Sequence, residues 1–139
     1  MLGKFYTTTQ TVVNAESLIP LNSCRTCGGG FRLIDGNAIE ICKGGCYEVN
    51  VAISASSADI TAPIDISLVV GSKNNGAFEP SAGARAIETT TTAGAISSLS
   101  IVDTVKVCNN SCCDKVLVAL KTVNQITVSN IIVTVRKVC

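Results

Sequence analysis

Eight cysteines are the residues of this chain best suited to chemistry, because a thiol can bind a metal, exchange electrons or form a disulfide. They form three clusters and one terminal position. In chain order these are Cys24 and Cys27; Cys42 and Cys46; Cys108, Cys112 and Cys113; and Cys139. Each lies at an expected strand end or turn, so their chemistry depends on which strand ends meet in the fold.

A structural zinc site is one interpretation of the first two clusters. Cys24-x2-Cys27 and Cys42-x3-Cys46 together supply four soft ligands in two closely spaced pairs, as tetrahedral zinc sites require. A redox-active Cys-x-x-Cys motif is excluded by its context. Residues 24–27 run into glycines and a strand, whereas that motif needs a helix N-terminus to lower the thiol pKa.

Disulfide bonds are the preferred interpretation of all eight cysteines. Cys42 and Cys46 bracket the loop 43–45, and the paired strand ends of a hairpin bring Cβ atoms within bonding reach. Eight cysteines allow about 105 pairings, so the connectivity stays open. Each bond adds about 2–4 kcal/mol by restricting the unfolded chain, and the set implies an oxidising final environment.

Catalytic motifs are missing from the sequence. The chain has no histidine, which removes the commonest general base, and it contains no nucleophile elbow, P-loop or dinucleotide fingerprint. Its carboxylates are scattered over polar faces and turns. We therefore expect no enzyme activity and no cofactor, and we favour a binding or structural role.

The composition indicates an all-β protein that associates with itself. Valine, isoleucine and threonine number 16, 14 and 14, and β-branched side chains fit a pleated, half-buried surface better than a helix. Hydrophobic residues make up 47% of the chain and charged residues only 15%, which favours an oligomer, although a tight β core gives the same statistic. A net charge of +1 with dispersed basic residues gives no sign of a nucleic-acid-binding face.

Strand-sized segments separated by turn residues span one domain, residues 1–139. Asp35-Gly36-Asn37 predicts a tight hairpin turn, and 45–54 alternates apolar Tyr47, Val49, Val51 and Ile53 with polar residues. In the last segment the alternation of apolar and polar residues changes phase near Ser129-Asn130, which predicts either two separate strands or one strand with a bulge. The expected strands are 5–13, 17–22 (an edge, from Pro20), 30–36, 37–42, 45–54, 63–71, 95–107, 115–123 and 125–138. Residues 71–94 are expected to be a flexible loop region, with a turn at 73–76 followed by a long loop or a weak strand.

Residues 36–54, GNAIEICKGGCYEVNVAIS, resemble the central motif of the C1q and tumour-necrosis-factor-like jelly rolls. In that superfamily a strand leads into a glycine turn and G-x-Y-x-V or G-x-Y-x-F opens the next strand, as at Gly45–Val49 here. The closing NIIVTVRKV (130–138) resembles the superfamily's last strand. The resemblance implies a jelly-roll antiparallel β-sandwich that forms a homotrimer. It implies these core or trimer-interface residues: Tyr47, Val49, Val51, Ile131, Val133 and Val135.

A narrower resemblance is to small cysteine-rich proteins of phages and prophages of Firmicutes. It rests on the opening Gln10-Thr11-Val12, on the cysteine clusters at loop ends and on the closing Val135-Arg136-Lys137-Val138-Cys139. The resemblance implies a capsid decoration or head-fibre protein that binds the major capsid protein on the outer surface of a phage head. Such a protein is made in the bacterial cytoplasm and released by lysis.

The sequence shows neither a membrane-spanning segment nor a secretory signal, as expected for a protein that is made in the cytoplasm and released by lysis. No apolar run approaches the roughly 18 residues of a membrane-spanning helix. A polar threonine run follows Phe5 and Tyr6 where a secretory signal needs an apolar region. We therefore expect no membrane partner and no signal peptide.

Two alternative functions remain open from the sequence. A spore-surface or exosporium-type jelly roll is also cysteine-rich and leaderless, and Cys139 at the end of the chain suits an intermolecular bond. A carbohydrate- or receptor-binding module is the second, since jelly rolls also serve as lectins. Two tyrosines, three phenylalanines and no tryptophan disfavour a sugar-stacking platform.

Overall fold

The protein is built from β-strands alone within the described part of the chain. The computed structural model describes residues 2–25, 30–72, 77–107 and 116–139, apart from the side chains of Ser72 and Ala82. The strands are β1 (Leu2–Thr7), β2 (Thr11–Val13), β3 (Ser23–Arg25), β4 (Phe31–Ile34), β5 (Ala38–Ile41), β6 (Gly45–Ser56), β7 (Ile64–Ser72), β8 (Phe78–Glu88), β9 (Ser97–Val107), β10 (Val116–Thr122) and β11 (Ile126–Lys137). Among these elements there is no helix that could cross a membrane.

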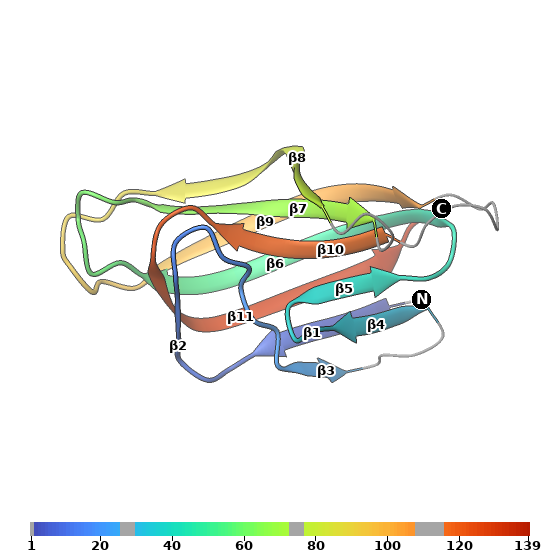
Figure 1. Cartoon of the computed structure of the whole chain (residues 1–139), viewed down its shortest axis with the longest axis horizontal. Coiled ribbons are helices and arrows are strands. Elements are labelled where there is room, and N and C mark those ends of the chain that lie inside the picture. The colour runs from blue at the N-terminus through green and yellow to red at the C-terminus, as the bar shows by residue number, and fades with distance from the viewer. Residues whose placement is uncertain (1, 26–29, 73–76, 108–115) are drawn as a thin grey trace.

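Two antiparallel sheets pack face to face (Figure 1). Sheet A has the order β3-β1-β11-β6-β9, with β2 also paired to β11, and sheet B has the order β4-β5-β10-β7-β8. Neighbours such as β11 and β6 are far apart in sequence, as expected for a Greek-key sandwich and not for a meander. The two termini lie at the same end of the sandwich (Figure 1). The predicted all-β sandwich is confirmed.

The core lies between the sheets and centres on three aromatic rings. Phe31 of sheet B stands edge-on to two rings of sheet A, with centroids 6.4 Å from Phe5 and 5.8 Å from Tyr47. These edge-to-face contacts are worth about 0.5–1.5 kcal/mol each beyond the buried area. The aliphatic side chains of the inner strand faces fill the rest of the core.

Local patterns correctly predicted several of these elements. The turn between β4 and β5 has Asp35 at φ 53° and Gly36 at φ 68°, the left-handed pair that a type I′ hairpin requires. In β6, Tyr47, Val49 and Val51 are at most 2% exposed, so the alternation does face the core. β11 is a single strand whose register shifts between Val128 and Asn130, which confirms the bulged form of that prediction.

The predicted strand 5–13 is wrong in its continuity, because it forms two strands. β1 pairs with β11 beyond the bulge, and β2 pairs with β11 before it. Between them residues 8–10 are exposed and carry no apolar side chain that would hold them in the sheet. The expected edge strand 17–22 contributes only an isolated bridge, from Leu18 to Lys121.

Of the two alternatives for the region 71–94, the structure shows the strand and not the long loop, because β8 is an edge strand paired with β7. Its sequence FEPSAGARAIE contains proline, glycine and four alanine or serine residues, so it has little intrinsic strand preference. Proline and glycine are tolerated at a sheet edge or bulge. Residues 81–84 lie opposite Leu68 alone, and this bulge carries Ser81 to the β9 edge of sheet A.

Candidate interaction face

The face of sheet A that points away from sheet B is the candidate site. We call it the outward face. Its residues alternate along each strand with the core residues. They include Leu2, Lys4, Tyr6, Val12, Ser23, Arg25, Glu48, Asn50, Ala52, Ser54, Ser98, Ser100, Val102, Thr104, Lys106, Thr127, Asn130, Ile132, Thr134 and Arg136.

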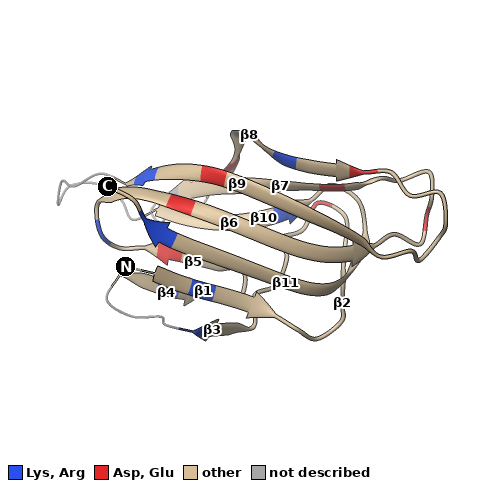
Figure 2. Ribbon diagram, turned by 180° about the vertical axis from the view of Figure 1, so that it is seen from behind, with Lys and Arg blue, Asp and Glu red and all other residues tan. Residues whose placement is uncertain are grey.

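Charges on the outward face gather toward the end where the termini lie. Arg136 and Glu48 form an ion pair at 3.1 Å, and Asn50 donates to the same Glu48 oxygen at 2.9 Å. Lys4 and Arg25 face each other across β1 and β3. Figure 2 shows that the rest of this sheet, toward β2, is without charged side chains.

The middle of the outward face is uncharged and carries mostly small side chains. The register continues across four strands, from Tyr6 to Ile132, then to Ala52, then to Ser100. Alanine and serine keep the β6 and β9 surface low, while Tyr6 and Ile132 stand beside it, half-buried. At the edge, Val102 is 62% exposed. Such a surface can be covered by a partner without removing charges from water, as the centre of a protein interface requires.

The predicted interface residues lie elsewhere. Their exposed fractions within a single chain are at most 2%, because their side chains pack against sheet B of the same chain. These side chains are therefore buried in the core of a single chain, and the surface available to another copy is the outward face. The six residues are Tyr47, Val49, Val51, Ile131, Val133 and Val135.

The outward face has a sequence signal of its own. It consists of the polar partners in the same alternation that identified the core face of β6, and those partners are mostly small and uncharged. A strand whose solvent side carries Asn50, Ala52 and Ser54 in place of lysine and glutamate indicates a side that is later covered. Only the order of the strands in sheet A, however, shows that the small, uncharged sides of neighbouring strands lie next to one another.

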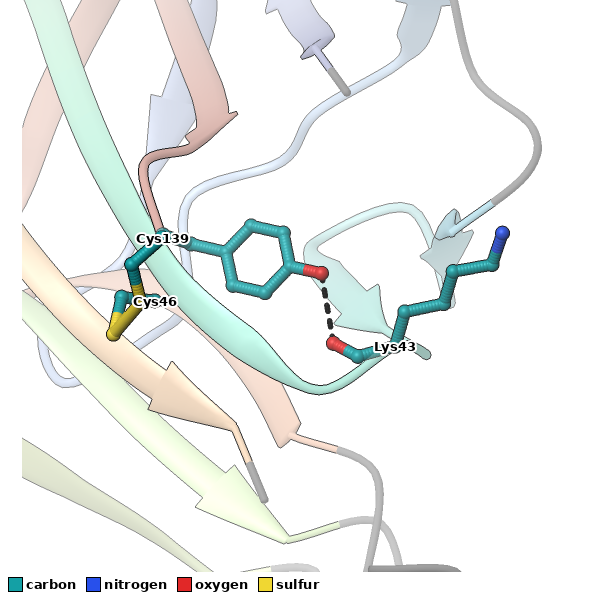
Figure 3. The surroundings of a disulfide bond; sticks show 4 residues. Lys43, Cys46 and Cys139 are labelled. Atoms are coloured by element: carbon teal, nitrogen blue, oxygen red, sulfur yellow. Dashed lines mark hydrogen bonds between the residues drawn. A yellow bond between two sulfur atoms is a disulfide. The ribbon is translucent and has the colours of Figure 1, made fainter. Parts of the chain in front are cut away.

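The observed disulfide bond differs from the bond predicted within the hairpin. Cys46, at the start of β6, is bonded to Cys139, 93 residues away, with 5.1 Å between the two Cα atoms (Figure 3). The expected Cys42–Cys46 bond is therefore wrong. The amide of Val138 also donates to the Cys46 carbonyl at 2.8 Å, so the C-terminus is held to β6 twice.

The remaining cysteines divide between described and undescribed parts of the chain. Cys24 is in a disulfide, and the Cys42 sulfur donates to Glu40 Oε1 at 3.2 Å. With Cys24 and Cys46 both oxidised, the proposed four-thiolate zinc set is not assembled in this state. Within the described ranges no three potential ligands are grouped. The candidates Cys27, Cys108, Cys112 and Cys113 lie outside the described residues.

Titratable groups of the described residues serve the fold. Burial, and then the nearby Cys42, raise the pKa of Tyr47, whose hydroxyl donates to the Lys43 carbonyl at 2.7 Å (Figure 3). Asp65, 5% exposed, accepts both hydrogen bonds of a bidentate pair from Arg85, and this carboxylate raises the pKa of Arg85. The Asp65–Arg85 pair connects the neighbouring strands β7 and β8.

Comparison with known proteins supports the fold. The sequence matches no family model and no curated protein. Among solved structures, the globular domain of zebrafish complement 1qA protein has a TM-score of 0.72 at 6% identity, covering 99% of this chain and 97% of that one. Eiger TNF from S. frugiperda has a TM-score of 0.66 at 12% identity, covering 100% and 92%. Murine APRIL has a TM-score of 0.66 at 13% identity, covering 99% and 100%.

At these identities the likeness concerns the fold alone, but it extends over nearly the whole of both chains in each comparison. Together with the two antiparallel sheets, it confirms the resemblance that residues 36–54 indicated. The chain is a jelly-roll β-sandwich with the fold of C1q and TNF-type domains.

Proposed function

We propose that this protein is a structural module that assembles as a homotrimer through the outward face and decorates the outer surface of a phage head. The observation that carries the proposal is the uncharged middle of the outward face, four strands wide, on a chain that is otherwise well closed around its core. The likeness to C1q and TNF-type domains supports a structural or receptor-binding module built on this fold.

A trimer suits a decoration role for a symmetry reason. Capsid lattices present threefold and quasi-threefold positions, and a trimer with one symmetric patch matches such a position with three equal contacts. The major capsid protein is the proposed partner. This part of the proposal rests on the resemblance to cysteine-rich virion proteins at Gln10-Thr11-Val12 and at the C-terminus.

The alternatives are less well supported. A spore-surface role was suggested by a Cys139 thiol available for bonds between chains, but Cys139 is bonded to Cys46 of the same chain. A sugar-binding role needs aromatic platforms, and Tyr6 is the only aromatic residue on the outward face. Self-association through that face uses its small and apolar side chains directly.

The association is tested by charging the outward face. Val102→Asp and Ile132→Asp place a carboxylate in the proposed interface and should convert the trimer to a monomer in native mass spectrometry and sedimentation, with the circular dichroism spectrum unchanged. Ile60→Asp is the matched control, because Ile60 is 50% exposed in the loop between β6 and β7, off the outward face. Unchanged assembly of both face variants would refute the interface.

The virion role needs a separate test. Antibody against this chain should label the heads of particles released when the producing bacterium lyses, as seen by electron microscopy. Label confined to unassembled protein or to cell debris would refute the capsid role while leaving the trimer intact.

A further inference from the structure

Lys4 is a charged residue of the outward face that has no counter-charge within the described chain. Its ammonium stands 6.0 Å from the centroid of the Tyr6 ring, and it takes part in no ion pair there. With Tyr6, Thr8, Arg25 and Ile132 it lines a hollow of about 260 Å³ on the β1–β3 side of sheet A. A hollow with a cation at its wall and an apolar floor fits a carboxylate better than a neutral group.

Asp103 is the corresponding charge at the opposite edge of the sheet. It lies on β9 opposite Val49, a position that faces inward, but at the edge of the sandwich it is only half-buried. The Ser81 hydroxyl from β8 donates to one of its oxygens, which holds the carboxylate between the two edge strands. The cleft beside it, about 350 Å³, is also lined by Glu79 and Lys106, so this edge has a net charge of −1 from these three residues.

The two charges lie at the same level along the strands. Hydrogen-bonded registers connect Lys4 to Thr134, Thr134 to Asn50, and Asn50 to Val102, which immediately precedes Asp103. Within one chain they are three strand spacings apart, about 14 Å. That exceeds the screening length of about 8 Å at physiological salt, so they do not stabilise the monomer by pairing. Figure 2 shows blue on β1 and red on β9, with β11 and β6 between them.

From this charge complementarity we infer that Lys4 of one copy pairs with Asp103 of the next copy around the trimer. The inference rests on the proposed function and specifies its contact. A ring of identical chains joins unlike edges, so the basic β1–β3 side of each copy meets the acidic β8–β9 edge of its neighbour. Neighbouring copies with their strands roughly parallel bring residues of equal level together. The pair therefore sets both the direction of the ring and the height at which copies meet.

A double-mutant cycle tests the pair. Lys4→Gln and Asp103→Asn each remove one charge while keeping hydrogen-bonding capacity. We expect each to raise the dissociation constant of the trimer, measured by sedimentation, by about tenfold or more. The combined variant should be no weaker than either single variant. Since the two residues are too far apart to interact within one chain, that non-additivity has to arise between copies.

Controls separate this contact from the trimer itself. Lys43→Gln makes the same change at an exposed lysine off the outward face and should leave the dissociation constant unchanged. Ser81→Ala removes the hydrogen bond from Ser81 to Asp103 and keeps both charges, so its dissociation constant gives the contribution of that hydrogen bond alone. If the wild type is a trimer and the two single effects multiply in the double variant, the Lys4–Asp103 contact is wrong. A wild type that sediments as a monomer overturns the proposed function and this contact together.

Discussion

The Cys46–Cys139 bond should be a large contributor to the stability of this protein. It closes a loop of 93 residues in sequence separation. In the chain-entropy treatment, a loop of that size removes enough freedom from the unfolded chain to be worth about 4 to 5 kcal/mol at 25 °C. A domain of this kind has a total free energy of unfolding of about 5–15 kcal/mol, so the bond supplies about a third of it or more.

The native state should change little when the bond is removed. The pairing of β11 with β6 continues to Lys137 opposite Tyr47, and the Val138 amide still donates to the Cys46 carbonyl. We therefore expect the fold to survive and the free energy of unfolding to fall. The variants Cys46→Ser, Cys139→Ser and the double substitution should lose the same amount, because each removes the same bond.

The assay is equilibrium unfolding in guanidinium chloride under non-reducing conditions. All proteins are compared at one concentration, because association adds to the apparent stability. A non-reducing peptide map first verifies that the fragments containing Cys46 and Cys139 are joined. Cys42→Ser is the matched control, since it keeps a donor for Glu40 and should change the free energy of unfolding little.

A loss below about 1 kcal/mol in all three variants, with the bond verified in the wild type, would refute the entropic argument. It would mean that the unfolded chain keeps its two ends together without the bond. Unequal losses among the three variants would instead show that a released thiol forms a new pairing.

Three further predictions follow from single contacts. Thr7, 2% exposed, donates to the Pro20 carbonyl and accepts from the Asn22 amide, both at 2.9 Å, so Thr7→Val should cost about 2–3 kcal/mol in a denaturant titration by leaving two backbone groups unpaired. Hydrogen bonds from Thr61 lower the pKa of Asp59 below its ordinary 3.8 in the folded protein. The ionised carboxylate therefore stabilises the fold at pH values above the pKa of Asp59 in the unfolded chain. That stabilisation is lost as the pH falls through the lowered pKa of the folded protein. An NMR titration of the Asp59 carboxyl carbon should therefore move to higher pH in Thr61→Ala, and an unmoved titration would contradict this cause. Gly36→Ala should cost about 1 kcal/mol because φ is +68°, while Gly36→Asn, which tolerates that conformation, should cost less; equal thermal midpoints would rule out backbone strain there.

The elements that were predictable share a local cause. Alternation of side chains is a property of a few consecutive residues, so the core face of β6 was visible from Tyr47, Val49 and Val51 alone. The Asp35-Gly36 turn was equally visible, because few residues accept two consecutive positive φ angles. The bulge in β11 showed as a change of parity near Ser129. Each of these features lies within one segment of the chain.

The elements that were missed depend on other parts of the chain. β8 has few strand-forming residues and exists because β7 offers it an unpaired edge. The split between β1 and β2 follows from the bulge in their common partner, β11. The outward face exists only because four strands bring their small, uncharged sides together, and local sequence does not state that order.

Sequence by itself determined that this protein is an all-β sandwich, with the inner faces of β6 and β11 in its core, because burial selects the period-two pattern that both strands carry. Only the tertiary structure decided that those side chains are buried within a single chain, and that Cys46 bonds Cys139 instead of Cys42. Both decisions depend on which surfaces meet across the sandwich and which strand ends converge. Spacing along the chain does not specify either, because antiparallel pairing can bring together residues at any separation.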